Sequence, residues 1–363
     1  MRIALLGTRG IPAGYGGFET FAEELSVRLV ERGHEVVVYC REPYALPTYR
    51  GVQLRYLPTI RHKYLDTLAH TFLSTIHLLA HRVDAALYCN AANAIFTILP
   101  RMTCIPVALN VDGIERRRKK WNVLARTWYH GSEFLSTLLP NAVVTDAQSI
   151  RVYYMEKYGR ESRFIPYGAD TVRAENQNAL VKLGLEPRRY FLYVSRLEPE
   201  NHALEVRQAF EQVPTEMKLA LIGDAPYADE YIARVRDTRD PRVVMPGAIY
   251  GEGYRELGSW CFAYVHATEV GGTHPALIEA MGHGCLILYR DNAENREVCG
   301  DAGLPYADQS GLTARMREAI GMSDLERQRY RARAVERVRE RYDWDAVTTQ
   351  YEDLLRSLIP KRC

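Results

Sequence analysis

The sequence lacks long hydrophobic runs and any marked excess of charge of one sign. None of its apolar stretches approaches the roughly 18–20 residues needed to span a bilayer. The opening MRIALLG is too short and too weakly charged for a signal peptide. The formal net charge of +2 is too small to indicate a nucleic-acid-binding protein. We therefore expect a cytoplasmic protein with no nucleic-acid partner.

The sequence also lacks paired cysteines. Its seven cysteines are odd in number and widely separated, and none forms a CxxC motif. This usage is typical of a reducing compartment and argues against a disulfide framework. Cys40, Cys89, Cys104 and Cys285 lie in or beside apolar runs, and we expect them to be small buried residues.

The chain is long enough for two domains, with 363 residues of which 47% are hydrophobic and 25% charged. Short β-branched runs alternate with helical patterns in two series, which is typical of α/β folds with a parallel sheet covered by helices. We expect two doubly wound, Rossmann-like domains over residues 1–170 and 171–335. A helical segment over 336–363 is expected to pack back toward the first domain. Ligands bind beyond the carboxyl ends of such strands, so a central cleft between the domains is the expected site.

A glycine-rich loop, GTRGIPAGYGGFET, follows the first predicted strand over residues 7–20. Its glycine spacing does not fit GxGxxG, and this argues against a dinucleotide-binding dehydrogenase. We expect the backbone at Gly16 and Gly17 to approach a phosphate or sugar. Glu19 is expected either to cap the helix that follows or to bind an acceptor.

Two amphipathic helical patterns lie in the first half of the chain. The first carries Phe21, Leu25 and Leu29 on one stripe, and Gly33 is placed to end it. The second covers residues 61–82 and has basic ends, which suits either a membrane surface or the core. We favour core packing, by apolar residues that include Leu68, Phe72 and Leu79.

The strongest chemical signal is FAYVHATEVGGTHPALIEAMGHGCLIL over residues 262–289, which predicts a strand, a glycine loop, a short helix and a strand. Thr273 suits the N-cap and Pro275 the first turn. The amides of Gly271 and Gly272 then form an anion site at a helix N-terminus. Glu279, farther along that helix, can accept two hydrogen bonds from a ribose diol. The alternative is an ordinary strand–helix–strand crossover with a surface glutamate.

A second signal is YVSRLEPENHALEV over residues 193–206. Arg196 stands at a strand end, where its guanidinium can bind a diphosphate through two hydrogen bonds. The alternative is a surface arginine paired with Glu198 or Glu200. Together with the segment 262–289, the position of Arg196 favours the phosphate role.

At these residues the chain resembles the retaining glycosyltransferases of the GT-B fold, in glycosyltransferase family four (group 1). Their C-terminal halves carry an R-L…K-N loop and an E-x7-E-A-M segment, which RLEPENH and ALIEAMGHG match in order and distance apart. The glycine-rich opening, NVDGIERRRKKW, IPYGAD and EVGGTHPALIEAM resemble a narrower branch, the bacterial rhamnosyltransferase-like enzymes of cell-surface polysaccharide assembly. The resemblance extends from residue 1 to about residue 355.

The resemblance implies transfer of a sugar from a nucleotide diphosphate, with retained configuration and with no metal or other cofactor required. In the narrower branch the donor is dTDP-L-rhamnose and the acceptor a glycan or a lipid-linked sugar. Arg196 and the amides of 271–273 would then bind the diphosphate, and Glu279 the ribose. Asp112 would orient the acceptor or the donor sugar, or it is a turn residue before Gly113.

Two positions depart from the family pattern. The first glutamate of E-x7-E falls on Gly271, and the nearest acid is Glu269, which is expected to contact sugar hydroxyls. The lysine that usually binds the diphosphate falls on Asn201, which we still expect at the donor. Arg196 and the helix N-terminus are therefore expected to carry more of the phosphate charge.

A basic run lies at Arg116, Arg117, Arg118, Lys119 and Lys120. It suits the phosphates of a lipid-linked acceptor or an anionic membrane surface, and a solvated loop is the alternative.

Three other interpretations stay open at this point. His77 and His81 have the spacing of a metal pair, but no Glu or Cys nearby completes a site, so we expect no metal. A GT-B nucleotide-sugar epimerase and a non-catalytic GT-B partner protein share the expected fold. Transfer is favoured by the loops RLEPEN and EVGGTHPALIEAM.

Overall fold

The computed structural model describes residues 1–14, 16–62, 64–118, 121–226 and 228–360. The chain divides into two compact units. The first consists of Met1–Tyr167 with the C-terminal segment from Trp344, and the second of Gly168–Asp343. Each unit is a parallel sheet flanked by helices, so the predicted fold class, two Rossmann-like α/β domains, is confirmed.

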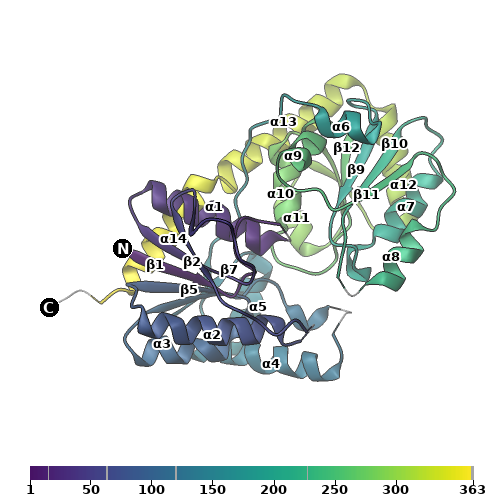
Figure 1. Cartoon of the computed structure of the whole chain (residues 1–363). Helices are drawn as coiled ribbons and strands as arrows, with labels where there is room; N and C mark the ends of the chain where they lie inside the picture. Colours follow the sequence, from purple (N-terminus) through teal and green to yellow (C-terminus); the bar gives the residue numbers. More distant parts are fainter. Residues whose placement is uncertain (15, 63, 119–120, 227, 361–363) are drawn as a thin grey trace. The chain divides into compact units, whose positions relative to one another are not determined.

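The first unit is built on an eight-stranded sheet in the order β3-β4-β2-β1-β5-β6-β7-β8, with only β3 and β4 paired antiparallel. Its strands are β1 (Arg2–Leu6), β2 (Glu35–Cys40), β3 (Thr48–Tyr49), β4 (Val52–Tyr56), β5 (Ala85–Cys89), β6 (Val107–Asn110), β7 (Ala142–Thr145) and β8 (Arg163–Phe164). Its helices are α1 (Gly17–Glu31), α2 (Asp66–Ala80), α3 (Ile98–Met102), α4 (Val123–Leu138), α5 (Gln148–Tyr158) and α14 (Trp344–Leu358), with short 3₁₀ helices η1 (Ala91–Thr97) and η2 (Glu115–Arg117). Figure 1 shows α1 and α14 on one face of this sheet and α2, α3 and α4 on the other.

Helix α1 forms as its sequence predicts. Phe21, Leu25 and Leu29 are buried on one stripe, and Gly33 follows the helix with a φ of +84°, a conformation that glycine adopts without strain. The last helix, α14, packs on α1, with the rings of Phe21 and Tyr351 5.2 Å apart. The C-terminal segment therefore belongs to the first unit although the second unit intervenes in sequence.

Helix α2 buries a different face from the one that its apolar pattern predicts. Its buried residues are mostly polar, and Thr75 Oγ1 lies 2.9 Å from the hydroxyl of Tyr88 beneath the helix. The prediction that Phe72 packs in the core is wrong, because its side chain is 45% exposed. Leu68 and Leu79 are only half-buried. Apolar periodicity therefore does not reveal which face of this helix is buried.

The second unit is built on a six-stranded parallel sheet in the order β11-β10-β9-β12-β13-β14. Its strands are β9 (Tyr190–Val194), β10 (Lys218–Ile222), β11 (Val243–Gly247), β12 (Ala263–His266), β13 (Leu286–Arg290) and β14 (Gly303–Tyr306). Its helices are α6 (Asn178–Leu183), α7 (Ala203–Glu211), α8 (Asp229–Arg236), α9 (Gly251–Trp260), α10 (Pro275–Gly282), α11 (Ala293–Cys299), α12 (Gln309–Gly321) and α13 (Asp324–Arg341), with 3₁₀ helix η3 (Pro199–Asn201).

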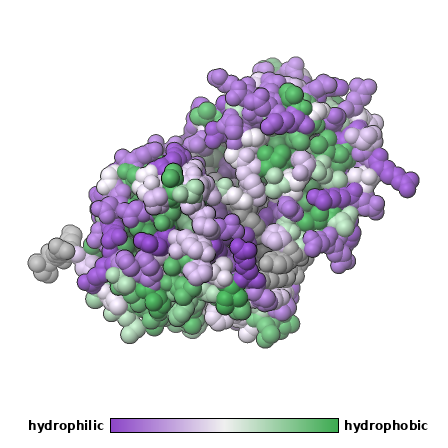
Figure 2. Space-filling view, in the orientation of Figure 1, coloured by the Kyte–Doolittle hydropathy of each residue, from purple (hydrophilic) through white to green (hydrophobic). Residues whose placement is uncertain are grey.

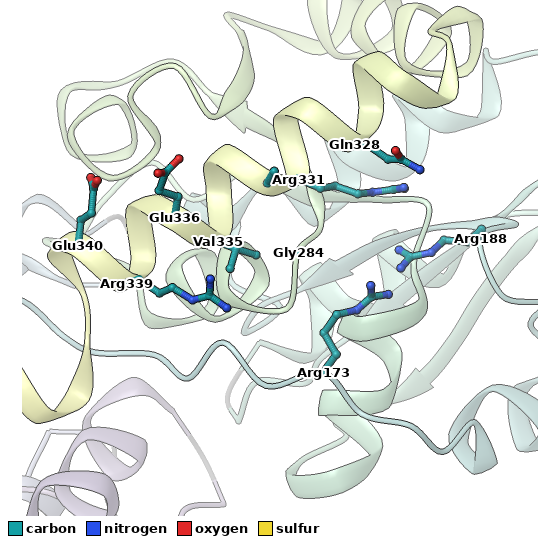
Figure 3. Close-up of a pocket in the computed structure, with 10 residues that line it drawn as sticks. Arg173, Arg188, Gly284, Gln328, Arg331, Val335, Glu336, Arg339 and Glu340 are labelled. Carbon is teal, nitrogen blue, oxygen red and sulfur yellow. The ribbon is translucent and has the colours of Figure 1, made fainter.

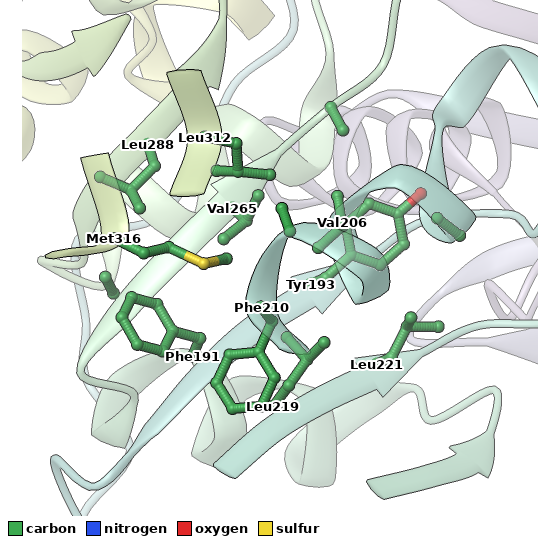
Figure 4. Close-up of a cluster of buried hydrophobic side chains, with 14 of the residues drawn as sticks. Phe191, Tyr193, Val206, Phe210, Leu219, Leu221, Val265, Leu288, Leu312 and Met316 are labelled. Atoms are coloured by element: carbon green, nitrogen blue, oxygen red, sulfur yellow. The ribbon is translucent and has the colours of Figure 1, made fainter. Parts of the chain in front are cut away.

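One apolar core joins α7 and α12 to a face of this sheet. Figure 4 shows Phe191, Phe210, Leu219, Leu288 and other side chains interdigitating between strands and helices. The ring of Phe210 lies 6.0 Å from that of Phe191 and is fully buried.

The structure bears on two expectations from composition, one on the burial of cysteines and one on membrane-spanning segments. Cys40, Cys89 and Cys285 are buried as predicted, but Cys104 is exposed in the turn after α3, so that prediction is wrong. Among the residues that the structure describes, no helix is long and apolar enough to cross a membrane.

The buried ring of Phe210 provides a test of the core. We expect Phe210→Ala to lower the free energy of unfolding by about 3–5 kcal/mol, because it removes buried apolar area and leaves a cavity. Denaturant unfolding followed by tryptophan fluorescence measures this loss. Leu325→Ala, at a side chain that is 58% exposed, is the matched control and should change stability by less than about 0.5 kcal/mol. An equal effect of both substitutions would contradict the assignment of the core.

Candidate functional site

The candidate residues of the second unit follow two neighbouring strands. β9 pairs with both β10 and β12, so the strand order reverses beside it. The segments that leave the carboxyl ends of β9 and β12 are residues 195–202 and 267–274. In doubly wound sheets ligands bind where the strand order reverses. The two motifs singled out in the sequence therefore meet at one edge of this sheet.

Arg196 lies two residues beyond β9, on a backbone that is tightly held. Gly223, at the end of β10, has a φ of +153°, and a Cβ there would lie 1.9 Å from the carbonyl oxygen of Ser195. Only glycine permits this approach. The Arg196 guanidinium lies 3.8 Å from Glu198, which is the pairing that the sequence alternative predicted, at a distance longer than a hydrogen bond. The Arg196 side chain is 29% exposed and remains accessible to a ligand.

Asn201 supports the loop that carries Arg196. Its side chain is buried, and its amide donates a 2.7 Å hydrogen bond to the carbonyl oxygen of Arg196. The Tyr193 hydroxyl in turn donates to the Asn201 carbonyl oxygen at 2.7 Å. Asn201 therefore holds the backbone of Arg196, and its contact with a donor stays a prediction.

The neighbouring residue, His202, lies between two carboxylates. Its Nδ1 is 3.0 Å from Glu205 and its Nε2 is 3.0 Å from Glu269. Both ring nitrogens therefore have a carboxylate partner. Glu205 also accepts from Arg290 at 2.9 Å. Burial alone would raise the pKa of Glu205, but its hydrogen bond from His202 and the charge of Arg290 together lower it.

The loop after β12 is held from two sides. The Glu269 amide donates to the Glu200 carbonyl oxygen at 3.0 Å, and Asn295 donates to the Thr268 carbonyl oxygen at 3.1 Å. A Cβ at Gly271 would lie 2.3 Å from the ring of His274, which explains the glycine.

The loop leads into α10 one residue later than predicted. The N-cap is His274, not Thr273, and Pro275 occupies the first turn as expected. Thr273 is buried, and Gly272 beside it is also buried. The predicted amides of Gly271–Thr273 therefore lie in the last residues before the helix.

Glu279 lies in the second turn of α10 and is half-buried. The Tyr254 hydroxyl, from α9, donates a 2.7 Å hydrogen bond to one of its carboxylate oxygens. Burial first, and then the charge of Glu279, raise the pKa of Tyr254 well above its usual value, so this hydroxyl keeps its proton. The carboxylate of Glu279 is thus fixed in orientation.

The glycine-rich loop of the first unit leaves the end of β1, where the order of that sheet also reverses. A Cβ at Gly7 would lie 2.3 Å from the Cys89 carbonyl oxygen, and Gly10 packs equally closely on Cys40. Gly16 is the N-cap of α1 and has an extended backbone with room for a side chain. Two of the glycines are therefore required for packing, and Gly16 is not.

Glu19 has a role that differs from both predictions. It is buried and accepts a 2.9 Å hydrogen bond from the backbone amide of Arg9. The carboxylate of Glu23, one turn later, accepts from the amide of Ala13 at 2.6 Å. Glu19 therefore ties the glycine-rich loop to α1 and does not cap the helix. Its contact with an acceptor stays a prediction.

Asp112 follows β6 with a left-handed backbone, φ +58°. Its amide donates to the side chain of Asn110 at 3.0 Å, so the turn that was one prediction for this segment is built by Asn110. The Tyr167 hydroxyl donates to Asp112 at 3.4 Å. The ring of Tyr167 packs edge-on against Phe18 of α1 at 6.3 Å. Asp112 and the start of α1 are therefore brought close together.

Two residues of the basic run form ion pairs within the first unit. Arg116 lies 3.0 Å from Glu133, and Arg118 is buried with its Nε 2.6 Å from Glu115. Lys119, Lys120 and the side chain of Arg117 lie outside what the structure describes. Burial would raise the pKa of Glu133, but hydrogen bonds from tyrosines and Lys157 and the charge of Arg116 lower it. Arg116 and Arg118 thus serve internal ion pairs.

Sequence comparison gives the family. Residues 15–173 match the family described as Glycosyltransferase Family 4, and residues 188–321 match the one described as Glycosyl transferases group 1. The two matches together cover most of the chain. The chain is a glycosyltransferase with the GT-B fold.

Individual relatives of this glycosyltransferase are distant. It is 27% identical over 139 residues to the Campylobacter jejuni N-acetylgalactosamine-N,N'-diacetylbacillosaminyl-diphospho-undecaprenol 4-alpha-N-acetylgalactosaminyltransferase, covering 38% of this chain and 37% of that protein. It is 25% identical over 185 residues to the Escherichia coli O-antigen chain mannosyltransferase B, covering 49% and 48%. The chain thus aligns with less than half the length of either curated relative.

A solved structure shares the whole fold. The structure of Anabaena HepE in complex with UDP and glucose superposes with a TM-score of 0.80 over 99% of this chain and 100% of that one, at 18% identity.

Two residues of the candidate site were not found by sequence reasoning. Tyr254 lies on α9, 25 residues before Glu279, and it is not part of any motif that the sequence analysis singled out. His202 was part of the RLEPENH motif, but only the structure shows that it bridges Glu205 and Glu269.

The lowered pKa of Glu205 predicts a pH-dependent contribution to stability. A depressed folded-state pKa gives stability that is present above the unfolded pKa, near 4.3, and is lost as pH falls through the folded pKa. We expect Glu205→Gln to cost about 1–3 kcal/mol of unfolding free energy at pH 7. The difference from the wild type should shrink below about pH 4. Urea unfolding across this pH range measures it, and a difference independent of pH would disprove the charged network.

Proposed function

We propose that this glycosyltransferase moves a sugar from a nucleotide diphosphate donor to a glycan or lipid-linked acceptor, with retained configuration, in bacterial cell-surface polysaccharide synthesis. The observation that carries the proposal is the grouping of Arg196, the loop Gly271–Thr273 and Glu279 beyond the neighbouring strands β9 and β12. The names of the two curated relatives, an undecaprenol-linked sugar transferase and an O-antigen mannosyltransferase, support the acceptor class. The UDP in the Anabaena structure supports the donor class.

In this proposal the second unit stabilises the departing diphosphate. Arg196 and the amides of Gly271, Gly272 and Thr273 supply positive charge where negative charge develops as the glycosidic bond breaks. Glu279 accepts hydrogen bonds from the ribose, with one oxygen oriented by Tyr254. No acid other than Glu279 is assigned to the nucleotide.

His202 lies beside residue 201, where the family pattern places a lysine. Its ring lies next to the Arg196 loop and is held by Glu205 and Glu269. Glu269 is proposed to contact hydroxyls of the donor sugar, with its position fixed by His202.

The first unit contributes its own residues in this proposal. The amides of Gly16 and Gly17, at the N-terminus of α1, suit the distal phosphate and the sugar of the donor. Asp112, linked through Tyr167 to the same helix, orients the acceptor or the donor sugar.

The resemblance makes dTDP-L-rhamnose the first donor to test. A thermal-shift series with dTDP-, UDP- and GDP-sugars identifies the nucleotide, since a bound ligand raises the melting temperature. Incubation with and without acceptor then identifies the reaction. Transfer releases nucleoside diphosphate and a lengthened acceptor, an epimerase converts the donor alone, and a non-catalytic partner protein does neither.

Substitution of Arg196 and Glu279 tests the donor site directly. We expect Arg196→Gln and Glu279→Gln each to weaken binding of the matching nucleoside diphosphate by about tenfold or more, because each removes a charged contact worth about 1.5–3 kcal/mol. Isothermal titration calorimetry measures the affinity. Glu252→Gln, at an exposed glutamate of α9, is the control and should bind as the wild type does. Unchanged affinity in both donor-site variants would exclude this site.

We further propose that the first unit contacts a membrane through an apolar face on α2, η1, α3 and α4. Exposed apolar side chains on these elements are Phe72, Leu73, Ile76, Ile95, Ile98, Met102, Val123, Leu124, Trp128, Phe134 and Leu138. Figure 2 shows hydrophobic residues gathered on this part of the first unit. The elements also pack on one another, α2 against η1 and α3, and α4 against η1. A patch this large is unusual on a protein that meets only water.

The charge around this apolar face favours an anionic bilayer. Residues 61–139 contain ten Lys and Arg and five Asp and Glu, although the whole chain is nearly neutral. Arg61, Arg101 and Arg126 are exposed, whereas Asp66 pairs with Arg41. Apolar side chains flanked by basic ones are typical of surfaces that lie in the headgroup region.

Vesicle binding tests the apolar face. We expect the wild type to sediment with vesicles that contain phosphatidylglycerol and much less with phosphatidylcholine vesicles. Combined Leu73→Ser, Ile76→Ser and Leu124→Ser should reduce binding about tenfold or more, because each buried aliphatic side chain contributes roughly 1.5–3 kcal/mol. Val181→Ser, at an exposed valine of α6, is the control. Unchanged sedimentation of the triple variant, or a wild-type dimer that the variant dissociates, would overturn the membrane role.

A further inference from the structure

The second unit contains a cavity of about 810 Å³ that is lined by four arginines. Arg173 precedes α6, Arg188 precedes β9, and Arg331 and Arg339 lie on α13. In Figure 3 the side chains of Arg173, Arg188 and Arg331 point toward a common space, whereas the carboxylates of Glu336 and Glu340 point away from it, to the other side of α13. No role in the proposed transfer reaction uses any of these residues.

This cavity lies at the opposite edge of the sheet from the proposed donor residues. Arg188 comes two residues before β9, and Gly284, which also lines the cavity, comes two residues before β13. Arg196 and the loop Gly271–Thr273 follow the carboxyl ends of their strands instead. In a parallel sheet the amino and carboxyl ends of the strands form opposite edges, so this is a separate site.

The three converging arginines are held by backbone carbonyls. Arg173 donates to the Ser259 oxygen at 2.8 Å, Arg188 to the Cys261 oxygen at 2.6 Å, and Arg331 to the Phe262 oxygen at 2.8 Å. A guanidinium has five N–H donors, so each of these contacts leaves most of them for a ligand.

No carboxylate neutralises this cluster. Among the described residues, no Asp or Glu oxygen lies within 4.0 Å of the guanidinium nitrogens of Arg173, Arg188 or Arg331. Burial first, and then the charge of Arg188, lower the pKa values of Arg173 and Arg331. Three like charges that face one space without a counter-charge create a strongly positive potential.

We propose that this cavity binds a phosphate group, as inorganic phosphate or as a phosphate monoester. Three guanidiniums that approach from different elements match the oxygens of one tetrahedral phosphate, which arginine binds through paired hydrogen bonds. This inference goes beyond the proposed transfer reaction and does not depend on it.

Binding at this site would join two segments that lie next to the boundaries of the second unit. Arg173 follows the boundary at Tyr167–Gly168 closely, and Arg339 precedes the boundary at Asp343–Trp344. The ligand would connect Arg173 of the first segment to α13, which leads into the second. The site is therefore suited to an effector that rigidifies these connections.

Thermal shift and calorimetry test the proposal with inorganic phosphate and glucose 6-phosphate as probes, in buffer without nucleotide sugars. We expect both probes to raise the melting temperature more than sodium chloride at equal ionic strength. Arg173→Gln and Arg188→Gln should each weaken binding about tenfold or more. Arg329→Gln, at an exposed arginine of α13 outside the cavity, is the matched control.

A further variant separates this cavity from the donor site. Arg196→Gln should retain binding of both probes, and Arg173→Gln should retain binding of the nucleoside diphosphate that fits the donor site. The proposal is overturned if neither probe binds, if the cavity variants bind both probes as the wild type does, or if Arg196→Gln abolishes binding. If the proposed transfer reaction is wrong, the expected binding of these probes to the cavity stays the same.

Discussion

The reversal of strand order beside β1 and β9 is the constraint on which both candidate sites depend. β1 pairs with β2 and β5, and β9 pairs with β10 and β12. In each sheet the chain connects to these two neighbours in opposite directions, so the loops at the carboxyl ends of the adjacent strands diverge and leave space between them. The glycine-rich loop occupies this position in the first unit, and Arg196 occupies it in the second. Catalytic chemistry at these edges needs no special fold, only side chains that the loops can hold in place.

Residues that a ligand would not touch provide that support. Asn201 and Tyr193 fix the backbone of Arg196, Asn295 holds the loop before Gly271, and Tyr254 orients Glu279. These contacts are hydrogen bonds of buried donors, which cost free energy when they are left unmade. A site built this way is preorganised, so binding energy is not spent on ordering its loops.

Sequence reasoning identified the elements but not these supports. The β-branched runs predicted the α/β class, and the apolar stripe and Gly33 predicted α1, because both signals are local. The same periodicity failed for α2, where polar residues are buried and Thr75 hydrogen-bonds to Tyr88 of the sheet. The burial of Asn201 was missed for a related reason: a motif gives the position of a residue but not whether its side chain points outward. Contacts such as that between Tyr254 and Glu279 join distant segments and leave no pattern in the sequence.

The arginine cavity shows how a structural need and a binding site arise from the same residues. Helix α9 ends at Trp260, and the carbonyl groups at and beyond its end have no partner within the helix. Cations are stabilised at such an end by the helix dipole. Arg173 and Arg188 satisfy the Ser259 and Cys261 carbonyls with one N–H each, and both stack near the Trp260 ring. Carbonyls carry only partial negative charge, so they fix the guanidiniums without neutralising them. A carboxylate at this position would have ended the repulsion between the arginines and closed the site to anions.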